Sequence, residues 1–142
     1  MKVSHEAPIQ YMDEIRGMID YDYCLPHLLD ESEEYKKYFQ QSKEIGRYII
    51  MDNSLHELGT PYDEERLWYW LNFYKPNEFI VPDFWEDKTK TLVSAKKWLS
   101  YNYPKNTIPV AVVQAKNKIE AFSCYHILKI QGYNKIAFSY GA

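Results

Sequence analysis

The chain has 142 residues, 46% of them hydrophobic, and a formal net charge of −3, which suits one domain with its own core and excludes a globally basic nucleic-acid binder. Charged residues make up 26% of the chain, which argues against disorder, and no apolar run approaches the roughly 20 residues that cross a membrane. The first residues lack the apolar stretch of a secretory signal, and Cys24 and Cys124 form no CxxC pair. We therefore expect a cytoplasmic protein with no membrane partner.

Short β-type runs alternate with helical patterns along the chain. The runs lie at 21–29, 48–53, 78–83, 108–114 and 135–140. Three of them are near-continuous apolar stretches, as expected for strands buried on both faces of a parallel sheet. The first run is the weakest of the five, because Pro26 interrupts it.

The helical patterns between these runs begin at residues that can cap a helix. The predicted caps are Ser32, Asp63, Asp87 and Asn117. Gly46 and Gly132 are typical of helix ends and are predicted to stop the first and last of these helices. A further helix is predicted over 8–19, where apolar residues recur at helical spacing.

Strict alternation of strand and helix predicts an α/β fold of βα units with parallel strands and right-handed crossovers, over a single domain at 1–142. Two architectures use units of this size. The first is part of a (β/α)8 TIM barrel, which needs about 200 residues or more when complete, so this chain would be its N-terminal portion. The second is an open five-stranded doubly wound sheet.

Polar side chains follow four of the runs, at the point where each predicted strand ends. These residues are Asp52, Asp83, Gln114 and Ser139. Because ligands bind at the carboxyl ends of parallel strands in both architectures, we expect one site there. Two carboxylates and a carboxamide suit a ligand rich in N–H donors, such as a purine-like base, better than a phosphate. His27 and Trp85 are predicted to line the same pocket.

Other interpretations of these residues stay open. A single aspartate after a strand is often a helix cap or a turn residue. Six lysines either bind a nucleic-acid phosphate backbone or form a solvated helix face. They are Lys88, Lys90, Lys96, Lys97, Lys116 and Lys118. No metal site is predicted, because the histidines, His5-Glu6 included, lack HExxH spacing, and no cofactor is predicted, because P-loop and GxGxxG motifs are missing.

Four segments, in their order and spacing, resemble the tRNA-guanine transglycosylase superfamily. They are YIIMDNSLHELG, EFIVPDFWED, PVAVVQAKN and KIAFSYGA. The likeness is greatest to the small phage-encoded members, which are associated with placing 7-deazaguanine bases in DNA. The family is a (β/α)8 barrel that exchanges a guanine for a 7-deazaguanine through a covalent aspartyl-sugar intermediate.

The resemblance implies a role for each matched residue. Asp52, in MDNS, would be the catalytic residue beside the reacting base, and Asp83, in VPD, would contact the base edge. Gln114, in VVQ, would be another base contact, and Ser139 would begin a base-contacting segment at 139–141. The implied partners are a nucleobase and DNA or tRNA, in the host cytoplasm if the chain is phage-encoded. Ala115 departs from the family pattern, which has glycine after the glutamine.

The resemblance also implies that the family's nucleophilic aspartate and zinc ligands fall beyond the fifth strand. We therefore expect a truncated or split N-terminal part of such an enzyme, with a second copy or a complementary chain covering its sheet edges. The alternative is a non-catalytic phage binding or inhibitor protein, whose rim holds a nucleobase-like ligand or a protein partner. A third interpretation is an α/β domain whose rim acids are only caps.

Overall fold

A five-stranded, all-parallel sheet forms the centre of the fold. The computed structural model describes residues 1–4 and 7–139. The strands follow one another across the sheet in chain order: β1 (Asp22–Cys24), β2 (Ile49–Met51), β3 (Glu78–Ile80), β4 (Ile108–Val113) and β5 (Ile136–Phe138). Helices alternate with these strands, which confirms the predicted α/β class.

Helices fill the intervals between strands. They are α2 (Pro26–Glu31), α3 (Glu33–Glu44), α4 (Leu55–Leu58), α5 (Glu64–Tyr74), α6 (Lys88–Leu99) and α7 (Lys118–Gln131). The four predicted caps are confirmed, because each side chain accepts a backbone N–H from the first turn of its helix: Ser32, Asp63, Asp87 and Asn117. Within the described part of the chain, no helix is long and apolar enough to cross a membrane.

The structure corrects two predicted elements and adds a third that was not predicted. The run at 21–29 is a strand only as far as Cys24, and Pro26 then occupies the first position of α2, where its missing N–H is not needed. The predicted N-terminal helix is three short helical pieces, η1 (Ile9–Tyr11), α1 (Met12–Ile15) and η2 (Arg16–Met18). The short helix α4 was not predicted.

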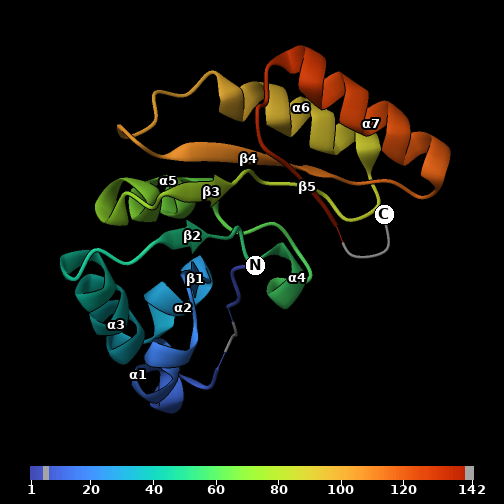
Figure 1. Cartoon of the computed structure of the whole chain (residues 1–142). Helices are drawn as coiled ribbons and strands as arrows, with labels where there is room; N and C mark the ends of the chain where they lie inside the picture. The colour runs from blue at the N-terminus through green and yellow to red at the C-terminus, as the bar shows by residue number, and fades with distance from the viewer. Residues whose placement is uncertain (5–6, 140–142) are drawn as a thin grey trace.

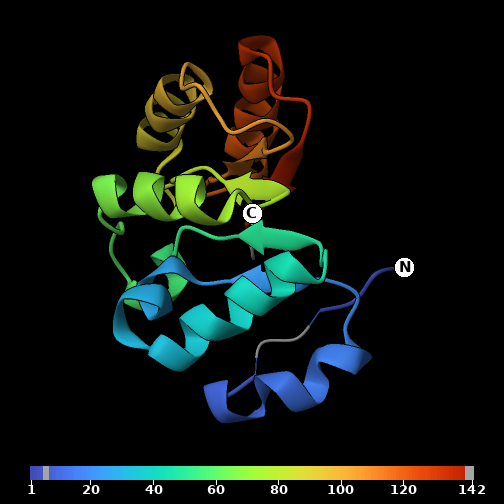
Figure 2. The same cartoon turned by 90° about the vertical axis from the view of Figure 1, so that its left-hand side faces the viewer.

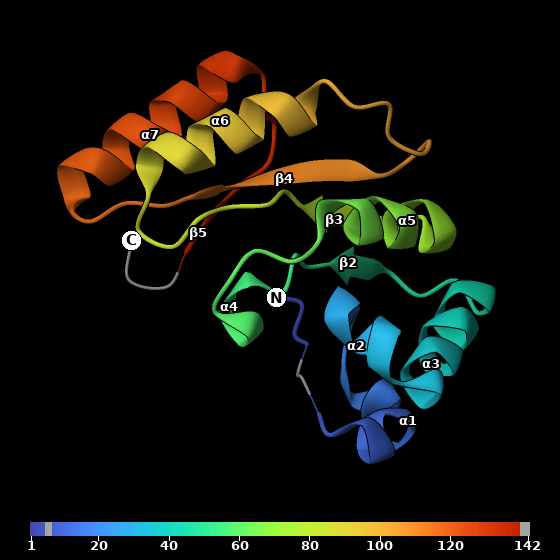
Figure 3. The same cartoon turned by 180° about the vertical axis from the view of Figure 1, so that it is seen from behind.

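The longer helices form an outer layer around the sheet (Figures 1 and 2). Helices α6 and α7 lie side by side along β4, and α3 lies next to α5 beyond β2 and β3, as the view from behind also shows (Figure 3). Fully buried side chains fill the space between these layers, with Met51, Phe79 and Val113 from the strands facing Phe39, Leu71 and Leu128 from the helices. On the opposite face of the sheet, strand side chains such as Ile80 and Val112 line a hollow.

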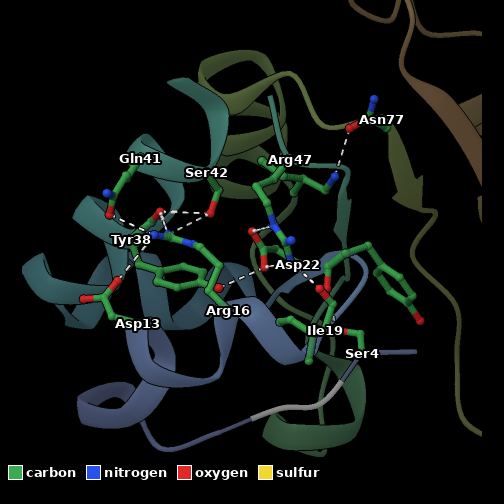
Figure 4. Close-up of polar contacts among 12 residues, drawn as sticks. Ser4, Asp13, Arg16, Ile19, Asp22, Tyr38, Gln41, Ser42, Arg47 and Asn77 are labelled. Carbon is green, nitrogen blue, oxygen red and sulfur yellow. Dashed lines mark hydrogen bonds and ion pairs between the residues drawn. The ribbon is translucent and has the colours of Figure 1, made fainter. Parts of the chain in front are cut away.

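The N-terminal helical pieces are tied to α3 by stacked and hydrogen-bonded guanidinium groups (Figure 4). The guanidinium of Arg16 lies 4.0 Å from the ring centroid of Tyr38 and donates to the backbone oxygen of Tyr38 at 3.0 Å. The hydroxyl of Tyr38 in turn donates to the buried carboxylate of Asp22 at 2.8 Å, and Arg47 donates to the same carboxylate at 3.1 Å. Tyr38 therefore links the N-terminal segment to β1.

Candidate functional site

A hollow of about 470 Å³ lies at the carboxyl ends of the strands, on the face of the sheet opposite the outer helices. This volume is in the range of small-molecule sites. Its base is formed by strand side chains that point to this face, such as Ile80, Val112 and Ala137. Five of the six predicted site residues line it: Asp52, Asp83, Trp85, Gln114 and Ser139.

Asp83 is the centre of a hydrogen-bond network in this hollow. Its side chain is buried, and Asn53 Nδ2 donates to its Oδ1 at 2.7 Å while Gln114 Nε2 donates to its Oδ2 at 2.6 Å. Burial raises the pKa of Asp83, and the two amides act in the opposite direction by favouring the charged form. The two amides come from the ends of β2 and β4, so this carboxylate is held from both neighbouring strands.

The orientation of Gln114 is fixed by its oxygen as well as its nitrogen. Gln114 Oε1 accepts the backbone N–H of Glu86 at 3.0 Å and the hydroxyl of Ser139 at 3.2 Å. Glu86 itself has a left-handed backbone, with φ 51°, which is uncommon for a residue with a side chain. The loop after β3 and the end of β5 thus both hold the carboxamide that contacts Asp83.

Asp52 lies on the same rim, half-buried at the end of β2. Burial raises the pKa of Asp52 to about 6, and repulsion from Glu57 and Asp83 adds to this, whereas the Asn53 backbone N–H and Tyr23 lower it. A carboxyl group with a pKa near 6 exchanges protons readily close to neutral pH, which is the property a general acid or base requires.

The raised pKa of Asp52 predicts how stability depends on pH. A carboxyl group whose pKa is higher in the folded state destabilises the protein as pH rises from the unfolded pKa towards the folded one. Asp52→Asn cannot titrate, so we expect it to remove this effect. Between about pH 4 and pH 7 the unfolding free energy of the variant should therefore fall by about 2 kcal/mol less than that of the wild type. Urea denaturation of both proteins at the two pH values measures the difference. If both proteins lose the same unfolding free energy between the two pH values, the pKa of Asp52 is not raised in the folded state.

His27 is the one predicted site residue that does not line the hollow. It lies in α2 rather than at a strand end, because β1 stops before Pro26. Its Nδ1 lies 2.8 Å from the hydroxyl of Ser54, a fully buried residue with a left-handed backbone, φ 63°, at the turn between β2 and α4. His27 therefore contacts the turn that follows Asp52 and Asn53, and it supports the rim from behind.

Nine further residues line the hollow that sequence reasoning did not predict as site residues, and those with polar groups are Tyr23, Asn53, His56 and Glu57. Asn53 follows Asp52 directly, and this adjacent polar side chain was the only available signal. Tyr23 reaches the hollow from β1. His56, on the unpredicted helix α4, faces Trp85 with 6.3 Å between the ring centroids, and both rings are exposed at the edge of the hollow.

No metal-binding group was found within residues 1–4 and 7–139, where no three His, Cys, Asp or Glu side chains come together in a way that could hold an ion. His5 and Glu6 lie outside the described residues, as does 140–141 of the segment that Ser139 begins. The rim of the hollow carries carboxylates, carboxamides and aromatic rings.

The fold and the hollow define the class: an α/β protein with a polar pocket at the carboxyl edge of a parallel sheet. Comparison with protein-family models, curated proteins and solved structures found no match for this chain.

Proposed function

We propose that the hollow binds a guanine-type base, guanine or 7-deazaguanine, and that the protein acts as a transglycosylase-like protein in base exchange. The observation that carries the proposal is the Asp83 carboxylate, held by two carboxamides in a buried position on the hollow. A carboxylate has about four acceptor positions, and the two amides use one on each oxygen. Acceptor capacity therefore remains for the N–H groups on one edge of a guanine.

Aromatic rings at the edge of the hollow favour a planar ligand. Stacked bases lie about 3.4 Å apart, so a base between two rings needs about 6.8 Å between them. The His56 and Trp85 ring centroids are 6.3 Å apart and the rings are tilted by 43°, so a base stacks between them only after the exposed Trp85 side chain turns parallel to His56 and moves outward. We propose that these two rings stack on the base whose edge Asp83 contacts.

The order of the strands supports a barrel-like architecture for this proposal. Strands in a (β/α)8 barrel follow one another in chain order, whereas doubly wound sheets reverse their order at a switch point. The sheet has the order β1-β2-β3-β4-β5, without such a reversal. In the proposed reaction the glycosidic bond breaks, the sugar carbon passes to a nucleophilic carboxylate that a complementary chain would supply, and Asp52 gives a proton to the departing base. The incoming base then displaces that carboxylate from the sugar, and Asp52 takes its proton.

A nucleic-acid strand is the proposed source of the base. A second hollow, of about 360 Å³, adjoins the first at Trp85, and Lys88 and Lys116 are among the residues that line it. Cationic side chains next to a base pocket suit a phosphate of the same strand, DNA or tRNA. Three acidic residues also line this hollow: Glu86, Asp87 and Glu120. Because they repel a phosphate, we propose that the hollow positions the nucleic-acid strand and contributes little to its affinity.

Calorimetric titration with guanine, 7-deazaguanine and adenine tests the proposal. We expect saturable binding of the first two bases, which share the same Watson–Crick edge, and at least tenfold weaker binding of adenine, which lacks the N1–H. Replacing Trp85 by leucine should weaken guanine binding about tenfold, because one stacked base is worth about 1–3 kcal/mol. Tyr69→Leu is the matched control, since Tyr69 is 50% exposed, as Trp85 is 53%, but lies on α5.

The opposite result would favour one of the alternatives. A folded wild-type protein that binds none of the three bases would overturn the proposed base pocket. Equal weakening by the Trp85 and Tyr69 substitutions would show that the effect does not come from stacking in the hollow. The rim acids would then be interpreted as caps and turn residues, and the protein as an interaction module.

A further inference from the structure

A second aromatic site lies on the outer layer, between α5 and the end of α6. It is a hollow of about 360 Å³ lined by Glu64, Glu65, Trp68, Trp98, Tyr101 and Asn102. None of these residues lines the hollow at the strand ends. The site is therefore separate from the proposed base pocket in both position and composition.

Three aromatic rings of this site stand at steep angles to one another. The Trp68 and Tyr101 ring centroids are 5.2 Å apart at 75°, and those of Trp98 and Tyr101 are 4.7 Å apart at 51°. Trp68 and Trp98 are 6.1 Å apart at 58°. Trp98 has no exposed surface, so a ligand in this hollow can contact only the partly exposed Trp68 and Tyr101 rings. The negative face of an exposed aromatic ring attracts a cation.

Carboxylates at the opening give the site a negative charge. Glu65 is exposed, and Glu64 is partly exposed and accepts a hydrogen bond from Lys97 Nζ at 2.6 Å. Hydrogen bonding to Glu64 raises the pKa of Lys97, and Tyr101 adds to the effect. Lys97 thus neutralises Glu64, and the exposed Glu65 carries the negative charge that is open to a second cation.

We propose that this aromatic site binds a methylated ammonium group. Such a cation is large, weakly hydrated and apolar at its surface, so it gains from ring faces and carboxylates together. A small metal ion would find too few oxygen ligands here, and an anion would be repelled by Glu64 and Glu65. The group can come from a free cation such as choline or from a trimethylated lysine side chain.

Titration of the full chain with choline and with N-acetyl-trimethyllysine amide tests the proposal and separates the two sources. The control ligand is 3,3-dimethylbutanol, which has the shape of choline without its charge. We expect saturable binding of at least one cation, with a shift of the Trp68 indole N–H resonance, and at least tenfold weaker binding of the neutral isostere. Trp68→Leu should weaken cation binding about tenfold.

Charge variants avoid the risk that the tryptophan substitution disturbs folding. Glu65→Gln is expected to weaken cation binding about threefold, because one attractive carboxylate is lost at an exposed position. Lys97→Met is expected to strengthen it about threefold, because it removes a competing ammonium from Glu64; Lys96→Met is the matched control and should change nothing. Equal binding of choline and its neutral isostere, or no binding by the folded wild type, would overturn the proposal.

Discussion

Replacing Asp22 by asparagine is expected to lower the free energy of unfolding by about 3 kcal/mol, because it breaks a buried ion pair without opening a cavity. The Asp22 carboxylate has no exposed surface, and Arg47, with 19% of its side chain exposed, lies 3.1 Å away. The variant leaves this guanidinium without its counter-charge, and its amide NH2 group turns a donor towards Tyr38 or Arg47, both of which already donate to Asp22. Urea denaturation at neutral pH measures the loss.

Asp13→Asn is the matched control for this prediction. Asp13 also faces an arginine, Arg16, at 3.5 Å, but 76% of its side chain is exposed. Water screens such a pair, so the expected change is below about 0.5 kcal/mol. Similar losses for the Asp13 and Asp22 variants would mean that burial of Asp22 does not decide the strength of its ion pair.

Replacing Asp83 by asparagine is expected to weaken guanine binding by about 10- to 100-fold, as the proposed function requires. Hydrogen bonds to a charged group contribute about 1.5–3 kcal/mol, and this range converts to that loss of affinity. The new amide group would also turn a donor towards Asn53 or Gln114, both of which already donate to Asp83. Calorimetric titration of the wild type and the variant with guanine gives the ratio.

A charge change elsewhere in the same loop is the control for Asp83. Glu86→Gln removes one negative charge from the loop after β3 and leaves untouched the backbone N–H that Glu86 donates to Gln114. We expect its guanine affinity to stay within about twofold of the wild type. If both variants bind guanine as the wild type does, Asp83 is a structural residue that orders the ends of β2 and β4.

The position of the rim residues could be predicted because it follows from the topology. Parallel strands present their carboxyl ends at one edge, so residues directly after β2, β3 and β4 meet wherever the alternation of strand and helix is correct. Asp52, Asp83 and Gln114 line one hollow for this reason. His27 was misplaced because the run at 21–29 was interpreted as one strand, whereas the helix-initiating effect of Pro26 separates β1 from α2.

The hydrogen-bond partners at the rim could not be predicted. Asn53 and Gln114 reach the same carboxylate only because β3 lies between β2 and β4 in a particular register, with Glu78 level with Ile50 on one side and Ile108 on the other. The raised pKa of Asp52 likewise depends on burial and on Glu57, which the turn into α4 brings near. The pairing of His56 with Trp85 depends on the left-handed turn at Ser54.

The sequence by itself determined the α/β class, the helix caps and the edge of the sheet at which polar residues gather. These features depend on hydrophobic periodicity and on interactions within about four residues, which a linear pattern records. Only the tertiary structure decided which oxygen holds which amide and which rings face one another. Residues such as Trp68 and Trp98 come together because the packing of α5 and α6 against the sheet sets their distance, and sequence spacing carries no information about that packing.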